Sequence, residues 1–237
     1  MSVGALNAVA LAMLLTVGVA ACDVAPGKAT ARPEPDRAPA QATAFRALYE
    51  QQCAGCHGRD GRLGAARPLN DPVYLALVPA ERIRRVVAQG VPGTAQPAFG
   101  RSAGGALADE QIDSLVGGLR EAWSRPDALG GASVPPYAAP LGNPERGGAV
   151  YAAACASCHG ADGRGGPSAR SVVDPSYLAL VSDQHLRTTV IAGRTDLGMP
   201  DWRGQIAGRA LSPADVSDVV AWLTTKRTPV PGRLGGS

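Results

Sequence analysis

Apolar residues recur at the spacing of a helix face over most of the chain, and few segments alternate as a half-buried strand does. One helix is predicted to begin at Ser212-Pro213, where a capping residue precedes a proline in the first turn. Its apolar face, at positions i, i+3, i+4 and i+7, is formed by Val216, Val219, Val220 and Leu223. Two further helical patterns run from Glu145 to about Ala156 and from Asp174-Pro175 onward, the latter with a break near Ser182. The predicted fold class is therefore all-α.

The chain is a duplication with a spacing near 103 residues. Tyr49 and the motif Cys53-Ala-Gly-Cys56-His57-Gly58 recur 102 positions later as Tyr151 and Cys155-Ala-Ser-Cys158-His159-Gly160. The segment 71–78 recurs 103 positions later as 174–181. A solenoid needs three or more repeats, so two copies indicate two tandem, similar helical domains.

We expect one domain at 43–127 and the other at 143–229, with a linker at 128–142 and a tail at 230–237. The linker contains Gly130-Gly131 and Pro135-Pro136, which do not continue a helix. Aromatic residues make up only 4% of the chain, so each domain has few bulky side chains with which to fill a core. Long glycine-rich loops are uncommon in small domains unless they wrap something. Both features indicate a bulky cofactor inside each domain.

The charge distribution excludes nucleic acid as a partner. The formal charge is +3, from 23 Lys and Arg against 20 Asp and Glu that are spread along the chain. A nucleic-acid-binding protein needs a concentrated basic face. Each predicted domain is also close to neutral, so strong electrostatic steering toward one type of partner is not expected.

The N-terminal segment is typical of an export signal. Residues 5–21 are uncharged and apolar and end in small residues directly before Cys22. This pattern resembles the lipobox of bacterial lipoproteins, in which the cysteine is lipidated. The alternative is an uncleaved anchor, although the stretch is shorter than the roughly 20 residues of a membrane span. We expect a signal at 1–22, a Pro/Ala-rich tether at 23–42, and a folded part on the periplasmic side of a bacterial membrane.

The other four cysteines form two Cys-x-x-Cys-His motifs, the attachment signal for c-type haem. The residues concerned are Cys53, Cys56 and His57 in the first copy and Cys155, Cys158 and His159 in the second. Two thiols at this spacing can add to the vinyl groups of one porphyrin, and the histidine places an imidazole nitrogen under the iron. A four-cysteine zinc site has its pairs about 15 to 20 residues apart, whereas 98 residues separate Cys56 from Cys155. Disulfides and thioredoxin-like redox pairs need no histidine. The sequence therefore predicts two covalently bound haem c groups.

With these motifs and this duplication, residues 43–229 resemble the dihaem class I cytochromes c. In that family the second axial ligand of the iron is usually a methionine on a loop before the last helix. Met199 is the one methionine outside the export segment, and Pro200 and Trp202 follow it closely. The resemblance implies that His159 and Met199 ligate haem 2 and that Trp202 covers the ring edge.

The resemblance also implies that a proline carbonyl accepts the second N–H of each proximal imidazole and so fixes its tautomer. Pro167 fits this role for His159. For His57 the nearest candidate is Pro68, which stands at a different spacing from its histidine.

The first copy departs from the family pattern at the sixth ligand. At an offset of 103, Gln96 stands where Met199 does, while the following proline and the aromatic Phe99 are retained. An amide is a poor ligand for ferrous iron. Haem 1 is then five-coordinate or water-ligated, weakly ligated by Gln96, or completed by a residue from a partner. His185, which replaces Arg82 of the first copy, is expected to be exposed on a helix.

These features predict an electron carrier. Methionine ligation raises the reduction potential of haem, so haem 1 should lie below haem 2 and pass electrons to it. We expect single-electron transport between redox proteins, with no substrate turned over, either free on the tether or as a subunit of a respiratory complex. The alternative is a small-ligand enzyme or sensor at an open haem 1, for example in peroxide reduction, where Arg101 is the only candidate helper.

Overall fold

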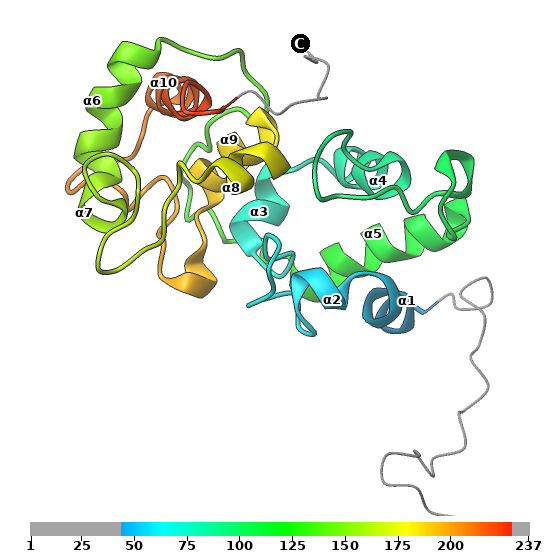
Figure 1. Cartoon of the computed structure of the whole chain (residues 1–237). Coiled ribbons are helices and arrows are strands. Elements are labelled where there is room, and N and C mark those ends of the chain that lie inside the picture. Colours follow the sequence, from blue (N-terminus) through cyan, green and yellow to red (C-terminus); the bar gives the residue numbers. More distant parts are fainter. Residues whose placement is uncertain (1–43, 229–237) are drawn as a thin grey trace, which may run out of the picture. The chain divides into compact units, whose positions relative to one another are not determined.

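The structure is a computed structural model that describes residues 44–228 (Figure 1). The expected signal with Cys22, the tether at 23–42 and the tail at 230–237 lie outside the described residues. The first repeat is residues 43–127 and the second repeat is residues 143–229. Among the described residues there is no helix with the length and hydrophobicity that crossing a bilayer requires.

The described residues form helices and isolated bridges but no extended strand, which confirms the all-α class. The helices of the first repeat are α1 (Phe45–Gln52), α2 (Ala54–His57), α3 (Pro72–Leu77), α4 (Ala80–Gln89), the 3-10 turn η2 (Arg101–Ala103) and α5 (Asp109–Trp123). Those of the second repeat are α6 (Pro144–Ala154), α7 (Ala156–His159), α8 (Pro175–Leu180), α9 (Asp183–Ala192), η3 (Thr195–Leu197) and α10 (Pro213–Thr224). Each repeat therefore has the same order of α-helices (Figure 1), although the 3-10 turn follows Gln96 in the first repeat and precedes Met199 in the second.

The predicted helix starts are found with their caps. The Asp174 carboxylate accepts the amide of Tyr177 at the start of α8, and the Ser182 hydroxyl accepts that of His185 at the start of α9. Ser212 forms a reciprocal capping box at the start of α10. Such caps satisfy backbone N–H groups that lack a partner in the first helical turn. The break expected near Ser182 is the boundary between α8 and α9.

Close packing of the first and last helix of each repeat requires glycine, but on opposite helices. In the first repeat α1 packs on α5, and a Cβ on Gly118 would lie 2.2 Å from Cγ of Phe45. In the second repeat α6 packs on α10, and a Cβ on Gly147 would lie 2.0 Å from the Asp218 carbonyl oxygen and 2.8 Å from Cβ of Trp222. The repeat relates Phe45 to Gly147 and Gly118 to Trp222. The large and the small residue have thus exchanged places.

The segment 128–142 contains no helix and is held against the second repeat. The buried Arg187 of α9 donates from Nε and Nη2 to the Pro136 carbonyl at 3.0 and 2.8 Å. Arg203 donates from Nη1 to the Leu129 carbonyl at 2.9 Å. These contacts satisfy carbonyls that an irregular segment would otherwise leave unpaired, so the linker is a fixed layer on the second repeat.

Candidate haem sites

Each Cys-x-x-Cys-His motif lies on a short helix that directly follows the first helix of its repeat. The histidines end α2 and α7, and the first cysteines, Cys53 and Cys155, stand at the helix junctions with φ of −120° and −122°. These two cysteines are half-buried, whereas Cys56 and Cys158 are exposed. The repeat thus gives both motifs the same local backbone.

The four thiols of the motifs are free, and two are held in the neutral form. Burial, together with negative charge on Cys56, raises the pKa of the Cys53 thiol to about 11. Burial likewise raises the pKa of Cys155 to about 11, with Cys158 acting in the same direction. A neutral S–H group is what adds across a vinyl double bond to leave a thioether.

His57 presents one ring nitrogen to the protein and leaves the other open. Its Nδ1 donates to the carbonyl oxygen of Arg67 at 2.6 Å, which places the proton on Nδ1. Burial lowers the pKa of His57, and the Arg67 and Arg194 charges lower it further, although the hydrogen bond to Arg67 opposes them. At pH 7 the imidazole is therefore neutral, and its Nε2 lone pair is available to a metal.

His159 has the same arrangement, with Nδ1 donating to the carbonyl oxygen of Arg170 at 2.9 Å. The expectation that Pro68 and Pro167 supply these carbonyls is therefore wrong. Pro68 directly follows the accepting residue of the first repeat, and the exposed Pro167 lies in the turn before the accepting residue of the second. Any residue offers a main-chain carbonyl, so the path of the loop decides which one meets the ring. The two acceptors are 103 residues apart, as the repeat requires.

Two tyrosines that sequence reasoning did not assign to the site fasten the turn after each motif. The Tyr49 hydroxyl donates to the carbonyl of Gly58 at 2.8 Å, and the Tyr151 hydroxyl donates to that of Gly160 at 2.7 Å. Both glycines have positive φ, and a Cβ on Gly58 would lie 1.8 Å from the carbonyl oxygen of Arg62. The signal was present in the sequence, because the tyrosines recur with the motifs.

Gln96 and Met199 occupy equivalent backbone positions. The amide of Val91 donates to the Gln96 carbonyl at 3.0 Å, and the amide of Arg194, 103 residues later, donates to the Met199 carbonyl at 3.0 Å. The Gln96 side chain donates from Nε2 to the carbonyl of Pro97 at 3.2 Å. The aromatic residues that follow differ in burial, since Trp202 is buried and Phe99 is half-buried.

His185 is half-buried, and the expectation that it is exposed is wrong. Burial, together with the charges of Arg67, Arg194 and a protonated His57, lowers its pKa to about 4. Two of these groups belong to the first repeat. The face of α9 that carries His185 is therefore within electrostatic reach of the first haem motif.

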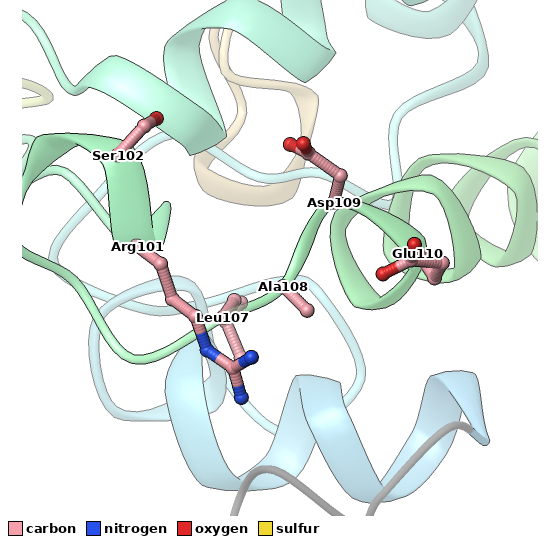
Figure 2. A pocket seen from close by; sticks show the side chains of 6 residues that line it. All are labelled: Arg101, Ser102, Leu107, Ala108, Asp109 and Glu110. Carbon is pink, nitrogen blue, oxygen red and sulfur yellow. The ribbon is translucent and has the colours of Figure 1, made fainter.

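The pocket at the start of α5 contains no assembled acid–base site (Figure 2). Its lining residues are Arg101, Ser102, Leu107, Ala108, Asp109 and Glu110. Figure 2 shows the Arg101 guanidinium beside Leu107, with the Asp109 carboxylate pointing away from it. A second pocket lies between the linker and α9, beside Leu141 and Gln184. Neither pocket is lined by a cysteine, histidine or methionine.

The donor set of each motif fits a covalently bound haem. Each supplies two free thiols and an imidazole held through Nδ1. In the described range no three His, Cys, Asp or Glu side chains lie together as a shared metal-ion site would need. When bound, haem would supply an iron that changes between the ferric and ferrous states.

Comparison with known proteins gives concordant matches. The stretches 40–117 and 142–223 match the family model described as cytochrome C oxidase, cbb3-type, subunit III. The Cbb3-type cytochrome c oxidase subunit CcoP of Azospirillum sp. (strain B510) is 28% identical over 175 residues, which are 66% of this chain and 54% of that protein. The chain thus spans about half the length of this relative.

Solved structures are also similar to parts of the chain. The KustC0563 c-type cytochrome is 30% identical with a TM-score of 0.30, covering 35% of this chain and 99% of its own. The Kuenenia stuttgartiensis reducing HAO-like protein complex Kustc0457/Kustc0458 is 21% identical with a TM-score of 0.46, covering 78% of this chain and 96% of its own.

Proposed function

The chain belongs to the family of cytochrome c oxidase, cbb3-type, subunit III, and from this premise we propose that it is a dihaem cytochrome c that carries single electrons in a respiratory chain. The observation that carries the proposal is the pair of Cys-x-x-Cys-His motifs, each with free thiols and an imidazole fixed through Nδ1. Such fixation orients the ring and keeps Nε2 basic, as outer-shell partners of metal-binding histidines do.

The proposed haem-binding residues lie in domains at 43–127 and 143–229, and the two domains differ in the sixth ligand. Thioethers would form at Cys53 and Cys56 in the first and at Cys155 and Cys158 in the second. His57 and His159 would be the proximal ligands, and Met199 the sixth ligand of haem 2. The polypeptide would orient the rings and exclude water, and each iron would gain or lose one electron without any bond being made or broken.

The proposed location is the periplasmic side of a bacterial membrane. The matched relative is named as an oxidase subunit, and we place this chain in or beside such a membrane complex, between a donor and an acceptor redox protein. Lipidated Cys22 or an uncleaved N-terminal segment would hold it there, and the 23–42 tether would give the domains reach.

Counting covalent haem tests the proposal. The chain is produced in a periplasm that matures c-type cytochromes, extracted with acid acetone and assayed for haem retained on the polypeptide. Two haems per chain are expected, and one in either the Cys53→Ser/Cys56→Ser or the Cys155→Ser/Cys158→Ser variant. Colourless protein, or pigment lost to the organic phase, would overturn the proposal.

A second candidate function is small-ligand binding at haem 1. It is favoured by the Gln96 amide, which donates to the adjacent Pro97 carbonyl and has no sulfur to offer iron. Carbon monoxide added to the ferrous protein distinguishes the two. Rapid binding by half of the haem indicates an open haem 1, and no binding indicates an electron carrier with both irons closed.

A further inference from the structure

Arg67 carries a guanidinium that is buried where the first repeat meets α9, with 7% of the residue exposed. Its Nη2 donates to Oγ1 of Thr189 at 2.8 Å, and the group lies 5.3 Å from the ring centroid of Tyr74. Its Nε and Nη1 are buried and have no hydrogen-bond partner. A buried cation is costly unless an anion accepts its N–H groups. These donors therefore indicate an acceptor that the polypeptide does not supply.

Neither Asp71 nor Asp196 hydrogen-bonds the Arg67 guanidinium. Asp71 acts on Arg67 through space, but its Oδ1 accepts the amides of Val73 and Tyr74 at 2.9 and 3.0 Å as the cap of α3. Its Oδ2 is also buried without a partner. Asp196 accepts from Nε and Nη2 of Arg194, both at 2.9 Å. Arg194 is thus satisfied within the protein, and Arg67 is not.

The main chain of Arg67 places this cation at the haem 1 site, because its carbonyl oxygen accepts Nδ1–H of His57. Haem carries two propionate carboxylates, and a guanidinium is the side chain best suited to bind a carboxylate. We propose that Arg67 binds a propionate of haem 1 through Nε or Nη1 while its Nη2 remains hydrogen-bonded to Thr189 of α9. This inference rests on the proposed function, because it requires haem 1 to be bound. Arg67 is then a positioning residue that ties haem 1 to the second repeat.

The charge also acts on the iron. A fixed positive charge disfavours the ferric state, which carries one more positive charge than the ferrous state. Arg67 therefore raises the reduction potential of haem 1, and it opposes the decrease that follows from the missing methionine.

Arg170 provides a matched control. Its carbonyl serves His159 as that of Arg67 serves His57, but its side chain is exposed. An exposed charge is screened by solvent and salt. Haem 2 therefore has no buried guanidinium at the equivalent position, and replacing the Arg170 side chain keeps the main-chain carbonyl.

The test is redox titration of full-length holoprotein with Arg67→Gln, Arg67→Lys and Arg170→Gln, after the covalent haem of each has been counted. Arg67→Gln is expected to lower one of the two midpoint potentials by a tenfold change in the redox equilibrium, about 59 mV for one electron, at both low and high salt. Arg67→Lys should restore most of this change. Arg170→Gln should shift neither midpoint potential by more than the equivalent of a threefold change in the redox equilibrium.

The outcomes are separable. Wild-type protein with fewer than two haems contradicts the proposed function. Two haems with both potentials unmoved in Arg67→Gln overturn the propionate contact and leave a water shared with Asp71 as the partner of the guanidinium. If Arg67→Gln fails to mature, a crystal structure of the wild-type holoprotein decides. Nε and Nη1 both lying beyond about 3.2 Å from every propionate oxygen would also overturn the proposal.

Discussion

Met199 and Gln96 share a backbone position and differ by one ligating atom. Each carbonyl accepts the amide of the residue five positions earlier, Arg194 or Val91, and in the second repeat the Met199 amide also donates back to the Arg194 carbonyl. The thioether of methionine is a soft ligand that suits ferrous iron, and an amide is not. The difference in ligation proposed for the two haems therefore depends on one side chain.

Met199→Gln should make haem 2 like haem 1. We expect two covalent haems as before, with the higher midpoint potential lowered by more than a tenfold change in the redox equilibrium, roughly 59 mV or more. Redox titration measures this change. An unchanged higher potential would show that Met199 does not ligate iron.

The reverse exchange, Gln96→Met, should supply haem 1 with a sixth ligand. The absorption spectrum of half of the haem is then expected to shift toward that of the other half, and carbon monoxide binding to it should slow or disappear. A haem 1 spectrum identical to that of the wild type would contradict the correspondence between the two positions.

The carbonyl acceptors of the two proximal histidines could not be predicted from side-chain patterns. Prediction found both motifs, because ligating side chains have distinctive chemistry and spacing. It chose Pro68 and Pro167 as acceptors, although the carbonyls belong to Arg67 and Arg170. A carbonyl carries no side-chain signature, so equivalence between the repeats was the better guide, because the two acceptors are 103 residues apart and the two prolines 99.

Helix starts, in contrast, could be predicted because caps are local. Ser212 and Asp174 cap α10 and α8 through their own side chains, and the sequence around each is sufficient to show it. The close approach of the terminal helices could not be predicted this way. Which glycine faces which aromatic residue depends on how helices far apart in sequence cross.

Gly147→Ala and Gly148→Ala form a matched pair on α6. A Cβ on Gly147 would lie 2.0 Å from the Asp218 carbonyl oxygen, so the helices must separate, and we expect a loss of about 2–4 kcal/mol in the free energy of unfolding. A Cβ on Gly148 would lie 3.4 Å from the Trp222 ring, which is tolerable. Alanine is the better helix former by about 1 kcal/mol, so Gly148→Ala should be neutral or stabilising. Urea unfolding of both variants checks this, and equal effects would contradict the close α6–α10 packing.

In the molecule as a whole, contacts between the repeats connect the segments that carry the sites. Both repeats belong to one compact unit of the chain. The Leu63 amide donates to Oδ2 of Asp196 at 3.2 Å, and the Ala95 amide, next to Gln96, donates to the Leu180 carbonyl at 3.2 Å. His185 is half-buried, with charges of both repeats acting on it. The alignment with Arg82 of the first copy suggested exposure instead, because it carries no information on packing between the repeats.

His185 should make stability depend on pH. Its pKa falls from about 6.5 when unfolded to about 4 when folded, so between these values the unfolded chain binds a proton that the folded protein does not. Stability is therefore lost as the pH falls from about 6.5 to about 4. We expect wild-type holoprotein to lose about 2 kcal/mol more than His185→Gln between pH 7 and pH 4.5. Urea unfolding at the two pH values measures this, and equal losses would show that His185 is protonated in the folded protein.

The exchanged glycine and aromatic residues have a consequence for how one polypeptide sorts two paralogous halves during folding. If α1 docked on α10, Phe45 would meet Trp222, and if α6 docked on α5, Gly147 would meet Gly118. Two aromatic side chains would overpack the first of these interfaces, and two glycines would leave a cavity in the second. Either arrangement is unfavourable compared with one glycine facing one aromatic residue. Each first helix therefore packs better on the last helix of its own repeat than on that of the other repeat. This protects a duplicated chain from the domain-swapped arrangements to which repeat proteins are prone.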